Sequence, residues 1–251
     1  MATSARIGRL SVLTIGLGIG AAMATAPGIA SADVFPPPFD PNNFAISIDG
    51  ITLFQVGTAH ATSGLGDFAI ADGAGSDASA FGGIFDFASA DGAGSFAIAG
   101  QGDPGETGSF DSASAVGTDS RAEAGLTGSF DSASSTGNDS FALAGFFGSG
   151  DSASAVGNDT LAEAGLGTAS APANFDFASD LTNFTTVPNV ATVLAEGGSN
   201  DVAFVVDPFG AIGSEAFAGF GGNFDLAGAF GDNFDINSIL SDFIFHIAPF
   251  F

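Results

Sequence analysis

Three aspartates that recur every twenty residues are the side chains of this sequence best suited to chemistry. Asp119, Asp139 and Asp159 each follow a glycine by two positions and precede Ser or Thr. The runs Gly137–Phe141 and Gly157–Leu161 match half of the nonapeptide G-G-x-G-x-D-x-U-x, in which Asp and backbone oxygens of adjacent turns hold calcium. The simpler interpretation is that each Asp hydrogen-bonds its own backbone as a turn residue. Turn residues and calcium ligands therefore both stay open at these three positions.

Other catalytic arrangements find little support. His60 and His246 are the only histidines, and no G-x-S-x-G sequence marks a nucleophile for a Ser/His/Asp triad. A zinc site would need more His or Cys ligands. A pair of carboxylates for glycoside hydrolysis stays open as a lesser alternative because Asp is abundant. We predict a protein that is not an enzyme and that binds no cofactor, with calcium as the one alternative.

The elements that carry these aspartates are internal repeats of about twenty residues. Gapless copies begin at Asp67, Asp86, Asp111, Asp131 and Asp151, and 101–107 is an insertion of turn residues. Within each copy, Ala alternates with polar or larger residues on both sides of a Gly-containing corner. Period-two alternation predicts strands, and fixed self-similarity predicts stacked units. We therefore predict an all-β fold, a short parallel β-solenoid or β-roll of about twenty residues per turn with β-rich caps.

The alternation also predicts which side chains face inward. Ala113 and Ala115 should share an inner face, opposite to the outward serines between them, and after the corner Ala122 and Ala124 should do the same. Strands stack about 4.8 Å apart, so a column of ionised aspartates costs about 0.9 kcal/mol per neighbouring pair even in water. For the column that begins the copies, we expect exposed carboxylates, or carboxylates bridged by a cation. The clearest members of this column are Asp111, Asp131 and Asp151.

The ends of the chain differ from the repeats. Arg6 and Arg9 precede an apolar stretch that ends in an Ala-Ser-Ala sequence at 30–32, the pattern of a cleaved signal peptide. The Asp49-Gly50 pair between alternating apolar residues predicts a hairpin or a first solenoid turn. The predicted parts are a signal peptide over 1–32, a Pro-rich leader over 33–44, an N-terminal strand cap over 45–66, the five-copy repeat solenoid over 67–167, and degenerate repeats with a C-terminal apolar cap over 168–251.

Charge and composition exclude several partners. The sequence has 28 acidic and 3 basic residues, a formal net charge of −25, and no Cys. Beyond residue 32, Arg121 is the only basic residue. Nucleic acid is therefore excluded, because phosphate binding needs Lys and Arg. A hydrophobic share of 45% with 28 Phe indicates a folded chain. After signal cleavage we expect no transmembrane helix.

Two resemblances follow from the repeats and the ends. The run Asp151–Gly165, Asp-Ser-Ala-Ser-Ala-Val-Gly-Asn-Asp-Thr-Leu-Ala-Glu-Ala-Gly, is similar to the head repeats of trimeric autotransporter adhesins, which implies a parallel β-roll, trimerisation and adhesion to host surfaces. The predicted signal peptide, the Asn223–Asp232 segment and the apolar ending resemble mycobacterial exported Ala/Gly/Asp-rich repeat proteins. In composition the chain is like their glycine-rich repeat family, but without its helical N-terminal domain. That resemblance implies secretion and association with the cell envelope.

These observations lead to a functional expectation. We expect a secreted or cell-surface, cell-wall-associated structural or adhesive protein whose working parts are outward ladders of Ser, Asp and Phe. A calcium-binding repeat module that folds on export is the alternative, and a solenoid enzyme acting on polysaccharide has lower weight. The expected partners are further copies of the chain and a host or envelope protein or glycan.

Overall fold

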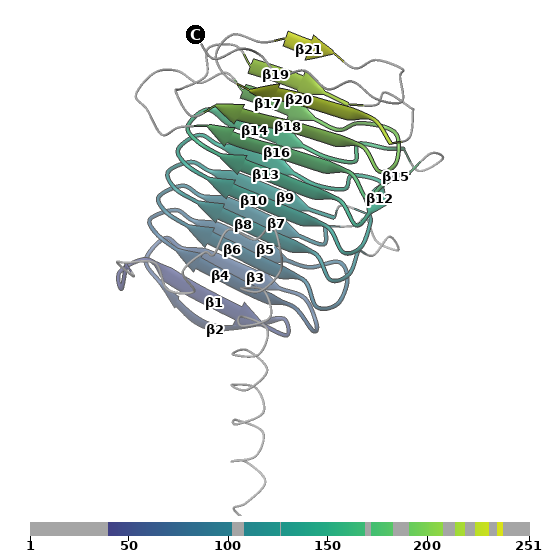
Figure 1. Ribbon diagram of the computed structural model, residues 1–251. Coiled ribbons are helices and arrows are strands. Elements are labelled where there is room, and N and C mark those ends of the chain that lie inside the picture. Colours follow the sequence, from purple (N-terminus) through teal and green to yellow (C-terminus); the bar gives the residue numbers. More distant parts are fainter. Residues whose placement is uncertain are drawn as a thin grey trace, which may run out of the picture. The chain divides into compact units, whose positions relative to one another are not determined.

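The structure is a computed structural model, and it describes residues 40–101, 108–125, 127–168, 172–182, 191–207, 214–218, 224–230 and 235–237. The predicted signal peptide, most of the leader and the apolar tail lie outside these ranges. Every regular element within them is a β-strand (Figure 1). The predicted all-β, largely parallel solenoid is confirmed. Within the same ranges, no helix has the length and apolarity needed to cross a membrane.

A hairpin begins the described stack. Strands β1 (Phe44–Ile48) and β2 (Ile51–Val56) pair antiparallel through Asp49 and Gly50, whose φ angles are 53° and 75°. These left-handed values explain the Asp-Gly pair, since both residue types tolerate this conformation at the centre of a two-residue turn. β1 also pairs antiparallel with the first solenoid strand of its sheet. Of the two structures predicted for this segment, a hairpin or a first solenoid turn, the hairpin is the one observed.

Each following turn of chain contributes one strand to each of two parallel sheets (Figure 1). The first sheet continues from the hairpin with β4 (Phe68–Asp72), β6 (Phe87–Asp91), β8 (Ser112–Val116), β10 (Ser132–Thr136), β13 (Ser152–Val156), β16 (Phe177–Thr182), β18 (Val202–Asp207) and β20 (Leu226–Phe230). The second sheet contains β3 (His60–Ser63), β5 (Asp77–Ala80), β7 (Phe96–Ala99), β9 (Arg121–Ala124), β11 (Phe141–Leu143), β14 (Thr160–Glu163), β17 (Ala191–Leu194), β19 (Ser214–Phe217) and β21 (Asp235–Asn237). The short strands β12 (Gly148–Ser149) and β15 (Ala173–Asn174) form a third sheet.

Two kinds of corner join the sheets. The first corner, 117–120 in the central copy, leads from the first sheet to the second, and the longer second corner, 125–131, leads back. Glycine at the first corner is dictated by contact between turns, because a Cβ on Gly117 would lie 1.8 Å from the carbonyl oxygen of Gly137. A side-chain ladder adds to the backbone bonds here: the Asn138 N–H donates to Asn158 Oδ1 at 3.0 Å.

The core is a stack of alanines, as the alternation predicted. In β8 the side chains of Ala113 and Ala115 are fully buried, and in β9 those of Ala122 and Ala124 are 0–1% exposed. Parallel pairing is in register, so that Ala133 lies beside both Ala113 and Ala153. The same pattern continues past residue 168, where Val193 and Val205 are larger members of the same core.

The narrow core predicts strong intolerance of larger side chains. We expect Ala133→Leu to lower the free energy of unfolding by about 1–3 kcal/mol or more, because extra carbons must be forced between stacked alanines. Ser134→Leu, at the adjacent outward position of β10, is the matched control and should change the stability by about 0.5 kcal/mol or less. Urea denaturation followed by circular dichroism measures both. Equal losses in the two variants would contradict this description of the core.

Candidate functional site: the second corner

The second corner of every described turn ends in a buried aspartate. In each turn, the Asp lies an even number of residues before the inward alanines of the strand that follows, as Asp111, Ala113 and Ala115 show. The alternation of the strand therefore directs the Asp side chain toward the interior. We call this set the aspartate column. Its members are Asp67, Asp86, Asp111, Asp131, Asp151, Asp176, Asp201 and Asp225, and each is 0–2% exposed. The expectation of exposed carboxylates was wrong, because the alternation of inward and outward side chains in the strand extends to the Asp itself.

In seven of the eight column members, Asp67 to Asp201, one carboxyl oxygen joins two turns. Oδ1 of Asp111 accepts a hydrogen bond from the backbone N–H of Asp131 at 3.0 Å, and Oδ1 of Asp131 accepts one from Asp151 at 2.9 Å. The same bond recurs from Asp67 to Asp225 at 2.9–3.0 Å. These bonds satisfy N–H groups that the corner geometry would otherwise leave buried without an acceptor.

The other carboxyl oxygen lies in a space left by glycines. Oδ2 of Asp111, Asp131 and Asp151 is buried and has no hydrogen-bond partner. A Cβ on Gly145 would lie 2.5 Å from Oδ2 of Asp151 and 2.8 Å from Oδ2 of Asp131. A Cβ on Gly128 would lie 2.6 Å from the same oxygen of Asp131. The Gly-x-x-Gly sequence of the corner therefore makes room for the carboxyls.

Burial raises the pKa values along the column and so favours the protonated carboxyl. Desolvation, the largest cause, raises the pKa of Asp131 to about 9, that of Asp176 to about 8 and that of Asp111 to about 7. It also raises the pKa values of Asp67 and Asp151 to about 6. The backbone N–H bonds oppose this increase in all five groups. For Asp131, charge on the neighbouring Asp111 and Asp151 adds to it. Ionisation of one column carboxyl therefore raises the pKa of its neighbours, as Asp131 shows.

An exposed phenylalanine precedes the aspartate in five turns. We call these residues the phenylalanine column, which comprises Phe85, Phe110, Phe130, Phe175 and Phe224. The rings of Phe85 and Phe110 stack with centroids 5.2 Å apart, and those of Phe110 and Phe130 are 5.0 Å apart. These three Phe residues hold the same repeat position in consecutive turns, so the stacks run along the solenoid.

The phenylalanine column is strained. All five residues have φ between 60° and 66°, the left-handed region that a bulky side chain rarely adopts. Gly66 and Gly150 occupy the same place in their turns with φ of 87° and 79°, so the corner itself requires this conformation. A non-glycine residue there costs about 1–2 kcal/mol, and a ring stack returns about 0.5–1.5 kcal/mol. The stacks therefore offset the strain only in part of the column.

The predicted metal residues lie at the first corner, away from the aspartate column. Asp119, Asp139 and Asp159 are exposed and adopt φ angles of 52–54°. Glycines hold the same left-handed position in earlier turns, with φ of 73° at Gly75 and 70° at Gly94. This geometry fits the turn interpretation. Across the residues that the structure describes, no three His, Cys or acidic side chains gather as a metal site. Calcium at these aspartates stays a prediction.

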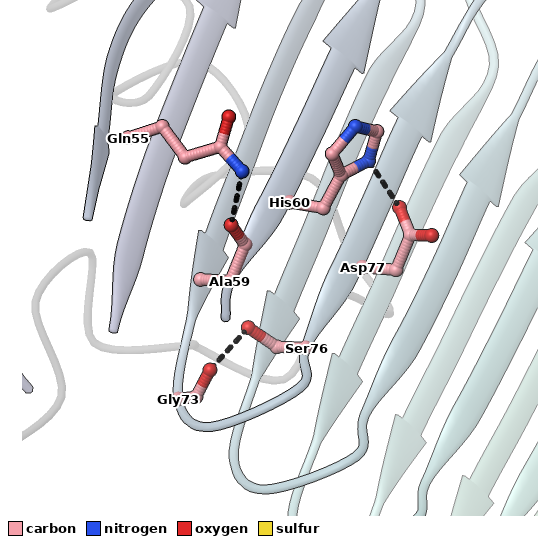
Figure 2. A network of polar contacts seen from close by, with 6 residues as sticks. All are labelled: Gln55, Ala59, His60, Gly73, Ser76 and Asp77. Atoms are coloured by element: carbon pink, nitrogen blue, oxygen red, sulfur yellow. Dashed lines mark hydrogen bonds and ion pairs between the residues drawn. The ribbon is translucent and has the colours of Figure 1, made fainter. Parts of the chain in front are cut away.

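The described histidine lies on the surface of the second sheet. Figure 2 shows His60 beside Asp77 of the next turn, with Nδ1 and Oδ1 3.4 Å apart and both side chains more than 40% exposed. Close by, the Gln55 side chain donates to the carbonyl oxygen of Ala59 at 3.0 Å. These contacts connect neighbouring strands, which fits a structural role for His60. His246 lies outside the described residues.

The Arg121 side chain is held on the surface by two aromatic rings. Its guanidinium carbon lies 5.4 Å from the centroid of Phe96 and 5.3 Å from that of Phe141, and the group pairs with Glu123. The three strands are in register, so Phe96, Arg121 and Phe141 are direct neighbours. The sequence analysis missed this contact, although the repeat alignment places the three residues at one position.

The fold and corner define a parallel β-solenoid with a buried carboxyl column. No protein-family model, curated protein or solved structure matches the chain.

The raised pKa values of the aspartate column lead us to expect that the fold is most stable in acid. A carboxyl whose pKa is raised by folding stabilises the protein fully below its unfolded pKa of about 3.9, and this stability is lost as the pH rises through the folded pKa. We expect the free energy of unfolding to decrease from about pH 4 to about pH 9. The slope is about 1.4 kcal/mol per pH unit for each carboxyl protonated only in the folded state. Denaturant melts across this range measure the slope.

Substitution of one column member tests the origin of that slope. Asp131→Asn keeps an Oδ1 acceptor for the Asp151 N–H and removes the ionisation, so the slope should become shallower and the stability at pH 9 should exceed that of the wild type. Asp119→Asn at the exposed first corner is the matched control and should keep the wild-type profile. A wild-type profile that rises from pH 4 to pH 9 would contradict the account.

The glycine cavity gives an independent prediction. Gly145→Ala should destabilise the protein by about 1–3 kcal/mol, because the new methyl group lies within 3 Å of two carboxyl oxygens. At Gly75 a methyl group would meet no atom within 4 Å, but φ is +73°. Gly75→Ala therefore reports backbone strain alone, about 1 kcal/mol. Thermal and urea unfolding compare the two. A larger loss in Gly75→Ala would show that the carboxyls do not fill this space.

Proposed function

We propose that this is a secreted or cell-surface structural and adhesive repeat protein without catalytic activity. The observation that carries the proposal is the outer face of the first sheet. Ser89, Ser114, Ser134, Ser154 and Ser179 are direct neighbours across five consecutive strands. A second column runs through Ser112, Ser132 and Ser152. This face thus presents a regular array of hydroxyl groups.

The array suits recognition of an extended polar partner. Hydroxyls both donate and accept hydrogen bonds, and strands of one sheet repeat about every 4.8 Å. The in-register alanines and the aspartate bonds fix the strands beneath them, so little order has to be gained on binding. A glycan or glycoprotein of the envelope or of a host surface fits this chemistry. Many weak, equivalent contacts would add up along the stack.

Bulky substitutions on this face test the proposal. In the full chain, the triple variant Ser114→Gln, Ser134→Gln, Ser154→Gln should reduce binding to isolated cell-envelope fragments of the producing organism, or to immobilised host-matrix glycoprotein, by at least about tenfold. Such a loss is about 1.4 kcal/mol and corresponds to one or two hydrogen bonds. A sedimentation assay with labelled protein measures the bound fraction.

A matched control uses the other sheet. Asp77→Gln, Leu161→Gln and Glu163→Gln place the same side chain at three positions of the second sheet that are not fully buried, and binding should persist. Circular dichroism confirms folding of both triple variants. If the wild type binds neither probe, or if both triple variants bind equally, the adhesive proposal is overturned.

A further inference from the structure

The phenylalanine column is an exposed apolar feature of the outer surface that the hydroxyl array does not involve. Its rings are 48–69% exposed although the backbone that carries them is strained. Glycine at Gly66 and Gly150 shows that the corner forms without a side chain at this position. A strained, exposed aromatic residue persists where some contact compensates for the strain. The contact that compensates for the strain of the phenylalanine column can lie within the chain or in a partner.

Contacts within the described chain compensate for only part of the column. Phe85, Phe110 and Phe130 stack on one another, and Phe175 lies over Gly150, where a Cβ would meet its ring at 2.7 Å. Phe224 has no stacked ring among the described residues and is 69% exposed. In the stacks, ring faces cover one another while ring edges stay in water. The apolar surface that stays exposed is a strip of Phe side chains along the outside of the second corner.

The surroundings of this strip carry little charge, unlike the chain as a whole. Ser109, Ser129, Ser149 and Asn174 occupy the position that precedes the column, and the aspartates that follow it are buried. Exposed carboxylates stand mainly at the first corner, at the other ends of the strands, whereas Asp49 of the hairpin turn accepts a hydrogen bond from the Gly66 N–H at the start of the column. Within the described second corners, Glu196 is the exception, and the insertion 102–107 carries two further acids outside the described residues.

We propose that the phenylalanine column is the interface through which a second copy of this chain binds. Among the described residues, few carboxylates lie beside the rings to attract a basic partner, and a formal charge of −25 repels a like copy over most other surfaces. The column is one strip where two copies meet without that repulsion. Its repeat along the stack lets two antiparallel copies place ring edges against ring edges about a two-fold axis, so that the contact is the same patch on both partners.

The size of the strip defines the strength of this contact. A Phe side chain offers about 150–250 Å² in all, so half-exposed rings leave roughly 100 Å² each. Five rings on each copy would bury about 1,000 Å² in total, near the lower limit for a specific interface. The dimer should therefore dissociate at micromolar concentration. This inference refines the proposed structural role, but it involves a different face from the hydroxyl array.

Glycine substitutions test the dimer without adding backbone strain. Sedimentation velocity on the full chain, from about 1 to 100 µM, should show a monomer–dimer equilibrium for the wild type. The triple variant Phe85→Gly, Phe110→Gly, Phe130→Gly should raise the dissociation constant at least about tenfold. The double variant Phe175→Gly, Phe224→Gly should weaken the dimer too, and it leaves the stacks of Phe85, Phe110 and Phe130 intact. Leu181→Ser, an exposed apolar residue of the first sheet, is the control and should not change the dimer.

Several results would overturn the proposal. A wild type that stays monomeric at 100 µM would do so, as would a dimer that keeps its affinity in both Phe variants. Dimer loss only on Leu53→Lys would place the contact on the exposed edge strand β2 instead. Binding to envelope or matrix is a separate readout: the Phe variants can lose the dimer while surface binding persists. Likewise, if the serine triple variant loses envelope or matrix binding but keeps the dimer, the hydroxyl array and the phenylalanine column are independent binding faces.

Discussion

The burial of a carboxyl group in every turn is the constraint on which this structure depends. A charged column of this kind would repel itself in a poorly hydrated interior, and protonation removes that cost. In return, one oxygen of each aspartate from Asp67 to Asp201 accepts an N–H group of the next turn, so the corners are joined from Asp67 to Asp225. The solenoid is thus held by polar bonds at one corner and by alanine packing between the sheets.

The same constraint accounts for the sequence around it. Glycines on both sides of the carboxyl, such as Gly128 and Gly145 around Asp131, leave the space that its second oxygen occupies. The residue before the aspartate must adopt a left-handed conformation, and the chain places Phe there in five turns. A corner that turns a carboxyl inward therefore turns an aromatic ring outward. The interior polar column and the outer apolar strip have one structural cause.

Much of this fold could be predicted from the sequence, because alternation and repeat length are local signals. The inward Ala113 and Ala115, the corners and the parallel stacking all follow from them. The burial of Asp111 also lay within reach, since it has the parity of those alanines, but the usual exposure of Asp outweighed that signal. The pKa of Asp131 and the cation–π contact of Arg121 depend on packing between turns, which only the three-dimensional structure supplies.

Proton release on unfolding measures the central claim most directly. At pH 7, Asp131 and Asp176, with pKa values of about 9 and about 8, hold protons in the folded protein. An unfolded Asp has a pKa of about 3.9 and would lose them. Denaturant-induced unfolding in a weakly buffered solution, followed by pH-stat titration, should therefore release about two protons per chain or more. Release of no protons, or net uptake, would show that the aspartate column is ionised and would contradict the account.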